Sequence, residues 1–508
     1  MNASVRFGSQ ALALEELVAL AEGRARADLQ DDAAFRDGIA RGARFVESLL
    51  AREGSVYGIT TGYGDSCVVA VPLAQVEALP RQLYTFHGCG LGRHLDPTAT
   101  RAVLAARLQS LCQGVSGVRV ELLERLTAFL REDILPLIPE EGSVGASGDL
   151  TPLSYVAAAL CGERQVLWRN EVREAAEVHA ELGWTPLVLR PKEALALMNG
   201  TAVMTGLACL AFARAEYLLR LATRITALNV VALAGNPEHF DQRLFAAKPH
   251  PGQGQVAAWL RADLAAEGPA APLHRLQDRY SLRCAPHVLG VLADSLPWLR
   301  QFIETELNSA NDNPLIDAED ERVLHGGHFY GGHIACAMDS LKTLVANVAD
   351  LLDRQLALLV DARYNHGLPG NLSGAPAERA MLNHGFKAVQ IGASAWTAEA
   401  LKGTLPASVF SRSTECHNQD KVSMGTIAAR DALRVLELTE QVAAATLLAA
   451  QQGIWLRRQK GVEPPAPLAA MHRDLGETFA PLIEDRALEA ELRQTLTLIR
   501  ARHWRLYA

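Results

Sequence analysis

No two of the eight cysteines in this 508-residue sequence have the short spacing of a zinc ribbon or a small disulfide framework. Their wide separation is typical of buried thiols in a reducing compartment. An excess of basic residues is also missing, since 49 Lys and Arg face 57 Asp and Glu, a formal net charge of -8. We therefore expect neither nucleic acid nor a membrane among the partners of this protein.

The sequence also lacks an uncharged hydrophobic run that could span a membrane. Its most apolar stretch, roughly residues 201–235, carries Arg214, Glu216, Arg220 and Arg224 and is expected to be a buried helix. The first ten residues show no charged start followed by an apolar segment, so no signal peptide is expected. The prediction is a cytoplasmic globular protein with a large core, in keeping with 49% hydrophobic and 21% charged residues.

Alternation of apolar and polar residues is rare, and only the segment 166–172 predicts a short strand pair. Apolar residues instead recur at helical spacing. They do so in short segments between residues 10 and 54, from about 73 to 135, and in four long runs, about 201–235, 334–363, 378–402 and 424–456. These patterns predict a mainly α fold, an all-α body with functional loops at its ends.

Composition divides the chain further. Residues 55–72 are rich in Gly, Thr and Ser and are expected to form a loop, as are residues 142–149. A proline-rich segment, 459–467, separates a last helical piece. We predict an N-terminal domain over residues 1–200 that carries both loops, a central long-helix bundle over 201–458, and a C-terminal helical segment over 459–508.

Residues 142–149 read Gly-Ser-Val-Gly-Ala-Ser-Gly-Asp, a composition that weakens helix and strand. If the amide nitrogen of Gly148 attacks the carbonyl carbon of Ala146, a five-membered ring closes, and loss of two waters leaves a methylidene on the former Ser147. Because Gly148 has no Cβ, nothing blocks this approach. The alternative is an ordinary turn before a helix that Asp149 caps. The spacing fits neither a serine-hydrolase elbow nor a phosphate loop.

This segment, with the Leu-Thr-Pro-Leu that follows, resembles the signature of the aromatic amino acid lyase family, which comprises histidine, phenylalanine and tyrosine ammonia-lyases and related aminomutases. The resemblance extends over nearly the whole chain. It implies that Ala146, Ser147 and Gly148 form 4-methylideneimidazol-5-one autocatalytically, with no metal and no external cofactor. It also implies a small-molecule aromatic amino acid as ligand, and a homotetramer with an N-terminal catalytic-loop domain on a long central helix bundle. Active sites would be shared between subunits.

Two further blocks are similar to catalytic segments of the family. Residues 56–64, Val-Tyr-Gly-Ile-Thr-Thr-Gly-Tyr-Gly, resemble the loop whose tyrosine is the catalytic base, which assigns that role to Tyr57. A phenol has a pKa of about 10, so nearby positive charge or amide donors must lower it for work near neutrality. Residues 277–284 resemble a block in which Arg283 would bind the substrate carboxylate and Tyr280 would assist in proton handling.

Other blocks carry asparagine and phenylalanine. In residues 195–201, Asn199 would hydrogen-bond the carbonyl oxygen of the electrophile and strengthen its electron withdrawal. Asn313 would contribute to carboxylate binding, and Phe329 would pack over the electrophile, although His328 stands where the family carries asparagine. The histidines of this segment lack the spacing of a metal motif, so no metal site is predicted. The remaining substrate-binding residues implied by the resemblance are Gly64, Leu150, Gln277, Glu415 and Asn418.

Two places bear on the substrate. Gln419 stands where histidine lyases carry a glutamate, and a neutral amide offers an imidazole no charged partner. The dipeptide Phe86-His87 aligns with the selectivity pair of the family: Phe86 makes the ring end of the pocket apolar, and His87 can hydrogen-bond a ring hydroxyl. We therefore predict an ammonia-lyase that converts L-tyrosine, L-phenylalanine or a hydroxylated analogue into a cinnamic-type acid. The alternatives are a tyrosine or phenylalanine 2,3-aminomutase and, less favoured, a histidine ammonia-lyase.

Overall fold

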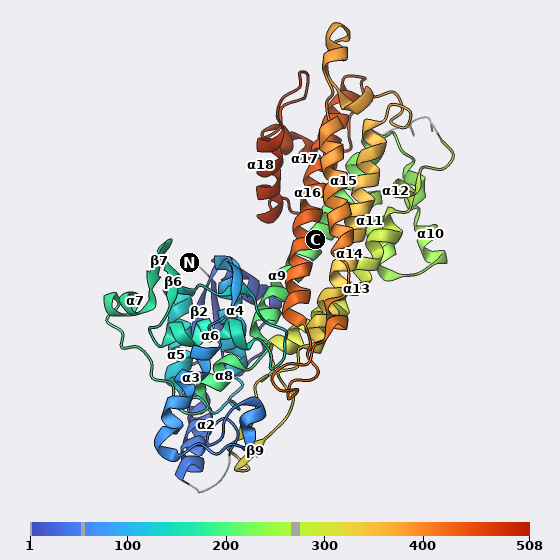
Figure 1. Ribbon diagram of the computed structural model, residues 1–508. Coiled ribbons are helices and arrows are strands. Elements are labelled where there is room, and N and C mark those ends of the chain that lie inside the picture. Colours follow the sequence, from blue (N-terminus) through green and yellow to red (C-terminus); the bar gives the residue numbers. More distant parts are fainter. Residues whose placement is uncertain (1–2, 52–55, 266–274, 508) are drawn as a thin grey trace. The chain divides into compact units, whose positions relative to one another are not determined.

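The computed structural model describes residues 3–51, 56–265 and 275–507. The chain divides into two compact units, and each is treated by itself (Figure 1). Unit 1 comprises Met1–Ala213, Arg300–Asp339 and Pro406–Arg430. Unit 2 comprises Arg214–Leu299, Ser340–Leu405 and Asp431–Ala508. Helices dominate both units.

The strands among the described residues all belong to unit 1 and form short ribbons. The parallel pair has Val5 opposite Ala27, and both of these residues are buried. It consists of β1 (Ala3–Phe7) and β2 (Ala25–Leu29). The antiparallel ribbons are β3 (Leu91–His94) with β5 (Pro139–Glu141), β4 (Leu135–Pro136) with β6 (Gln165–Trp168) and β7 (Glu171–Glu174), and β8 (Leu315–Asp317) with β9 (Arg322–Leu324).

Helix α4 (Pro97–Leu111) forms the centre of unit 1 and is buried on nearly all sides. It begins sharply because Asp96 accepts a hydrogen bond from Ala99 N at 2.8 Å and proline occupies the first turn. Helices α1 (Leu14–Ala21) and α5 (Val120–Arg131) pack against it. The remaining helices confined to this unit are α2 (Ala33–Ala51), α3 (Leu79–Phe86), α6 (Leu150–Leu160), α7 (Ala175–Glu181) and α8 (Glu193–Met198).

Unit 2 is built on long helices rich in Ala and Leu, which permit close packing between helices (Figure 1). The longest elements that contribute to it are α9 (Ala202–Ala232), α13 (Ala285–Leu307), α14 (Gly332–Val360) and α16 (Gly425–Arg458). Shorter helices complete the unit: α10 (Gln242–Ala247), α11 (Pro251–Leu264), α12 (Tyr280–Arg283), α15 (Lys387–Lys402), α17 (Ala466–Gly476) and α18 (Glu489–Arg500).

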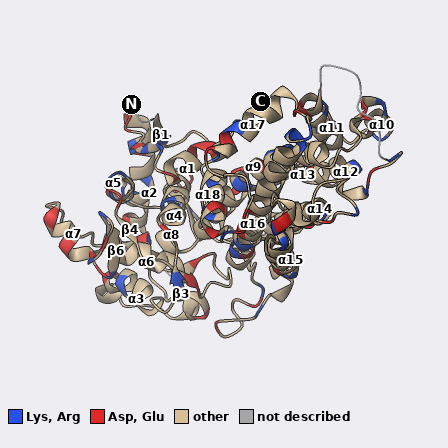
Figure 2. Ribbon diagram, turned by 90° about the horizontal axis from the view of Figure 1, so that it is seen from above, with Lys and Arg blue, Asp and Glu red and all other residues tan. Residues whose placement is uncertain are grey.

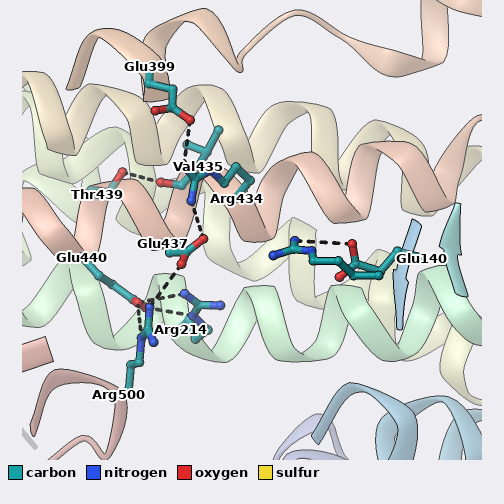
Figure 3. Close-up of polar contacts among 10 residues, drawn as sticks. Glu140, Arg214, Glu399, Arg434, Val435, Glu437, Thr439, Glu440 and Arg500 are labelled. Atoms are coloured by element: carbon teal, nitrogen blue, oxygen red, sulfur yellow. Dashed lines mark hydrogen bonds and ion pairs between the residues drawn. The ribbon is translucent and has the colours of Figure 1, made fainter. Parts of the chain in front are cut away.

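Ion pairs tie α16 to its neighbours in unit 2 (Figure 3). Both oxygens of the buried Glu440 accept hydrogen bonds from Arg214 of α9 at 2.8 Å. Arg434 contacts Glu399 of α15 at 2.8 Å. Solvent screens the exposed pair on Arg434, whereas loss of Arg214 would deprive the buried charge of Glu440 of its bidentate partner and destabilise the unit.

Charges of both signs are interspersed along the ribbon (Figure 2). Helix α9 is long and apolar enough to cross a membrane by length and composition alone. However, 83% of its most apolar window is buried inside the protein, as in a core helix.

The predicted mainly α fold is confirmed, and so are the strand pair β6–β7 and the long helices α9, α14 and α16. The run expected over 378–402 begins as a helix only at Lys387, because residues 377–382 form a 3-10 turn. The parallel pair β1–β2 was not predicted, although both segments, Ala-Ser-Val-Arg-Phe and Ala-Arg-Ala-Asp-Leu, alternate apolar and polar residues as a half-buried strand does. The three-domain division stays a prediction.

Candidate active site

The glycine-rich residues 142–149 form a tight loop between β5 and α6. Its three glycines have φ values of 116°, 67° and 72° in chain order, which glycine adopts without steric cost. At Gly148 space also requires glycine, because a Cβ would overlap the carbonyl oxygen of Gly200 and lie 2.7 Å from the Gly200 nitrogen. The amide of Asp149 donates to the same Gly200 oxygen at 2.7 Å. The loop therefore contacts Gly200 at the residue whose nitrogen is predicted to react.

Two side-chain amides reach Ser147. Asn199 Nδ2 donates to the carbonyl oxygen of Ser147 at 2.8 Å, and Gln419 Nε2 donates to Ser147 Oγ at 3.2 Å. The backbone nitrogen of Asn313 donates to Asn199 Oδ1 at 2.7 Å and so fixes the orientation of that amide. A donor on the Ser147 carbonyl withdraws electrons from the atoms beside it, which is the role expected of Asn199.

Asp149 is fully buried and collects four hydrogen bonds. Its carboxylate accepts from Val203 N and Met204 N at 3.0 Å each, from Ser143 Oγ at 3.1 Å, and from Thr426 Oγ1. Burial raises the pKa of this carboxyl, and the four donors act in the opposite direction. Asp149 takes the N-cap position of α6, as predicted, but its side chain makes no cap bond there. The carboxylate caps the start of α9 instead.

Tyr57 lies next to a backbone amide. Its hydroxyl accepts a hydrogen bond from Gly64 N at 2.9 Å. Burial raises the pKa of Tyr57, the Gly64 amide lowers it, and the nearby carboxylate of Glu415 raises it again. The net direction is upward, whereas a base that works near neutral pH needs a lowered pKa. The role of Tyr57 as base stays a prediction, and the amide donor that this role needs is present.

The segment that contains Glu415, Asn418 and Gln419 reaches the Tyr57 loop on one side and Ser147 on the other. Glu415 Oε1 accepts from Asp65 N at 2.8 Å, and its Oε2 accepts from Asn418 Nδ2 at 3.0 Å. Glu415 has a φ of 51°, in the left-handed region, and so have the next two residues. This bend places the exposed carboxylate beside Gly64 and leaves Gln419 facing Ser147.

Phe86 and His87 end helix α3. Their ring centroids lie 4.4 Å apart, and the His87 carbonyl accepts from Ser154 Oγ at 3.2 Å. Burial lowers the pKa of His87 to about 4, so its imidazole is neutral near pH 7. Phe86 is 59% exposed in the single chain. The expected apolar wall at Phe86 therefore stays a prediction.

Asn313 also holds the segment that carries Phe329. Its Oδ1 accepts from Gly326 N at 2.8 Å, while its backbone supports Asn199. Phe329 itself is half-buried, and so is Leu150 at the start of α6. His328 is exposed, and its ring lies beside Gly326.

Gln277, Tyr280 and Arg283 belong to unit 2, where they are grouped around α12. Arg283 Nε donates to the carbonyl oxygen of Asp278 at 2.9 Å, and its guanidinium lies over the Tyr280 ring, 4.7 Å from the centroid. Tyr280 is 72% exposed, and Gln277 is exposed as well. The cluster around Ser147 belongs to unit 1 and does not include these three residues.

Sequence analysis missed the buried charges of unit 1. Lys192 and Asp312 form an ion pair in which both side chains are fully buried, directly before Asn313. Arg107 is fully buried in the middle of α4. The available signal was a charged residue in a segment that is otherwise apolar or small on every side, Ala-Val-Leu-Ala-Ala-Arg-Leu.

Comparisons with known proteins agree with the resemblance. The chain matches the family model described as aromatic amino acid lyase over residues 12–477. It is 40% identical over 464 residues to a histidine ammonia-lyase of Chloroflexus aurantiacus, which covers 90% of this chain and 88% of that protein. A histidine ammonia-lyase structure from Trypanosoma cruzi has a TM-score of 0.90 at 32% identity and covers 98% of this chain and 94% of that one. A tyrosine aminomutase structure from Streptomyces globisporus has a TM-score of 0.90 at 34% identity, with 99% and 97% covered.

The prediction of L-tyrosine or L-phenylalanine as substrate is wrong. Relatives that are 36–40% identical over most of the chain are histidine ammonia-lyases. The argument from Gln419 fails for a physical reason, since its amide faces Ser147 Oγ and a carboxylate, Glu415, lies in the same segment. The site therefore keeps a negative charge, on Glu415, although residue 419 is neutral.

Proposed function

Because the chain belongs to the aromatic amino acid lyase family and is a carbon–nitrogen lyase, we propose that it removes ammonia from L-histidine and leaves the imidazolyl acrylate. The identity to histidine ammonia-lyases over about nine-tenths of the chain is the observation that carries this proposal.

The electrophile is part of the proposal. The loop fits 4-methylideneimidazol-5-one because Gly148 contacts Gly200 with no room for a Cβ, and because Asn199 donates to the carbonyl of Ser147. The group would supply an electron-poor carbon next to the bound amino acid. Asn199 would keep its hydrogen bond to that carbonyl, and Gln419 would lie beside the carbon that carried Ser147 Oγ.

The proton would be moved by Tyr57. As a base it would take the β-proton of the substrate on its Oη, which now accepts the hydrogen bond from Gly64 N. That amide stabilises the phenolate form. Arg283 would hold the substrate carboxylate through its planar guanidinium, with Tyr280 and Gln277 beside it.

Recognition of an imidazole ring has two candidate partners in unit 1. The carboxylate of Glu415 lies beside Gly64 and can accept a hydrogen bond from a ring N–H. His87 is neutral near pH 7, so its ring can donate or accept one hydrogen bond without carrying charge. Both groups suit a heteroaromatic side chain, whereas a phenyl ring would use neither.

The proposal includes the assembly and the location. A homotetramer with shared active sites would bring Arg283, Tyr280 and Gln277 of one copy to the Ser147 cluster of another. A cytoplasmic location fits the dispersed cysteines and the burial of α9.

The test is a direct comparison of substrates. Purified protein is assayed against L-histidine, L-tyrosine, L-phenylalanine and L-dihydroxyphenylalanine, and the unsaturated product is followed by its ultraviolet absorbance. L-histidine should give the highest kcat/KM, and Ser147→Ala should give no turnover with any substrate. No turnover of L-histidine beside turnover of another amino acid would refute the proposed substrate while leaving the reaction class intact.

A further inference from the structure

A positively charged side chain lies buried behind the loop of residues 142–149. Arg107 is 0% exposed in a helix whose residues from Ala99 to Leu111 are nearly all buried. Burying a charge in such surroundings is costly unless good partners compensate for the lost hydration. An apolar side chain would be the expected occupant, so the position of Arg107 calls for a specific role.

The partners of Arg107 are neutral. Its Nη1 donates to the carbonyl oxygen of Asn199 at 3.2 Å, and its Nη2 donates to Ser110 Oγ at 3.0 Å. Ser110 Oγ in turn donates to Asn311 Oδ1 at 3.1 Å. Burial lowers the pKa of Arg107 to about 10, against the charges of Asp312 and Asp149, so the guanidinium stays positive near neutral pH. Its main backbone contact is the peptide that follows Asn199.

That peptide is where the reactive loop is held. A Cβ on Gly200 would overlap Arg107 Nη1 and lie 2.5 Å from Asn311 Oδ1, so the guanidinium packs directly against Gly200. On its other side, Gly200 accepts the hydrogen bond from Asp149 N and contacts Gly148. The neighbouring Asn199 side chain holds the Ser147 carbonyl. Two residues, 199 and 200, thus fix three consecutive loop residues, and Arg107 fixes those two.

We propose that Arg107 is a positioning residue for formation of the electrophile: it holds the Asn199–Gly200 backbone so that Gly148 N stays near the carbonyl carbon of Ala146. The inference rests on the proposed function, since that function requires the ring. An amide nitrogen is a weak nucleophile, and its attack depends on a near-attack geometry. A misplacement of about 1 Å costs roughly a hundredfold in rate.

The step positioned by Arg107 balances without an oxidant. Gly148 N bonds to the Ala146 carbonyl carbon, and its proton passes to the oxygen. That oxygen leaves as the first water with the proton of Ser147 N, which forms a C=N bond. Ser147 Oγ then leaves as the second water with the Ser147 α-proton, which forms the methylidene.

The experiment measures ring formation rather than turnover. Full-length wild type, Arg107→Met and Arg107→Lys are synthesised in a cell-free system, and intact mass is followed over time in the folded fraction isolated by size-exclusion chromatography. Wild type should become two waters lighter. Arg107→Met, which keeps bulk but loses the charge and the donors, should do so about a hundredfold more slowly, and Arg107→Lys should lie between them.

A matched control comes from unit 2. Arg457 is another buried arginine whose guanidinium donates to backbone carbonyls, those of Ala232, Asn365 and His366. Arg457→Met should lose stability yet form the ring at the wild-type rate. If Arg107→Met yields no folded fraction, Arg107→Lys and Ser110→Ala carry the test, and both should slow ring formation. Ser110→Ala removes the acceptor of Arg107 Nη2 together with the donor to Asn311 Oδ1.

Three results decide against the proposal. Loss of both waters at the wild-type rate in folded Arg107→Met would overturn this inference and leave the proposed function standing. The same rate in both folded Arg107→Lys and folded Ser110→Ala would do so as well. Equal slowing in Arg457→Met would overturn it as well, because a general loss of stability would then explain the effect. A fully active wild type that never loses two waters would instead refute the electrophile of the proposed function, and this inference with it.

Discussion

Replacement of Asp149 tests whether the buried carboxylate holds the reactive loop in place. Asp149→Ala removes the acceptor of four donors: two backbone amides at the start of α9 and two hydroxyls, those of Ser143 and Thr426. Asp149→Asn keeps one oxygen in the same place. A single carboxylate oxygen, Oδ2, already accepts both backbone amides, so an asparagine oxygen can replace it.

The two variants differ in the donors that they leave unsatisfied. Hydroxyls can rotate to other acceptors, but the amides of Val203 and Met204 cannot, and each buried unsatisfied donor costs about 1–3 kcal/mol. Asp149→Ala should therefore lower the free energy of unfolding by about 2–6 kcal/mol. Asp149→Asn replaces charge-assisted bonds by neutral ones, at about 1 kcal/mol each, and removes a buried charge, so its net cost should stay below about 2 kcal/mol.

The assay is urea unfolding followed by circular dichroism, with unfolding rates compared where refolding is incomplete. Asp339 provides a matched control, because its buried carboxylate accepts from Ala407 N and Ser408 N at a distance from the loop in sequence. Asp339→Asn should lower stability without changing the mass loss of the electrophile. An Asp149→Ala cost below about 1 kcal/mol, or an Asp149→Asn cost as large as that of Asp149→Ala, would refute the account of the donors.

Other predictions follow from the same geometry. Tyr57→Phe should lose turnover by about 10²–10⁴-fold while intact mass still shows loss of two waters; retained turnover would remove Tyr57 from the role of base. Because the pKa of Tyr57 is raised, kcat/KM should climb with pH through the alkaline range. Glu415→Gln removes a negative charge near Tyr57 and should move this rise in kcat/KM to lower pH. A pH profile that does not move would contradict the effect of Glu415 on Tyr57. Gly148→Ala should keep the unreacted mass, since its Cβ meets the Gly200 carbonyl and its φ of 72° costs alanine about 1–2 kcal/mol.

Sequence reasoning located the loops and helices whose signals are local. Three glycines in eight residues weaken helix and strand alike, and long Ala- and Leu-rich stretches with apolar residues at helical spacing favour helices such as α16. The start of α15 was misplaced because residues 377–382 keep a helical composition but form a 3-10 turn. The pairing of β1 with β2 depends on contacts across 22 positions, which no local pattern contains.

The sequence predicted only those site residues that belong to motifs, and these motifs contain residues expected to contact the substrate or the electrophile. Asn199 belongs to such a motif, and the geometry gives it the expected partner, Ser147. Arg107 belongs to none, because it acts on the backbone of Asn199, which comes from elsewhere in the chain. The substrate was misjudged for a related reason: Gln419 was read as a side chain facing the ring, whereas its direction is set by the left-handed run that begins at Glu415.

The hydrogen bonds that Asn199 accepts bear on its strength as a donor to Ser147. Each acceptor of Asn199 is occupied: Asn313 N donates to its side-chain oxygen, and Arg107 donates to its backbone oxygen. Donation to an amide oxygen increases the positive character of its N–H group, and chains of hydrogen bonds polarise one another in a low-dielectric interior. Arg107 acts on a different amide, the peptide between Asn199 and Gly200, and so contributes by holding the backbone in place. In the proposed function, the Asn199 side chain would withdraw electrons from the carbonyl of Ser147, and the bond from Asn313 N would strengthen that donor.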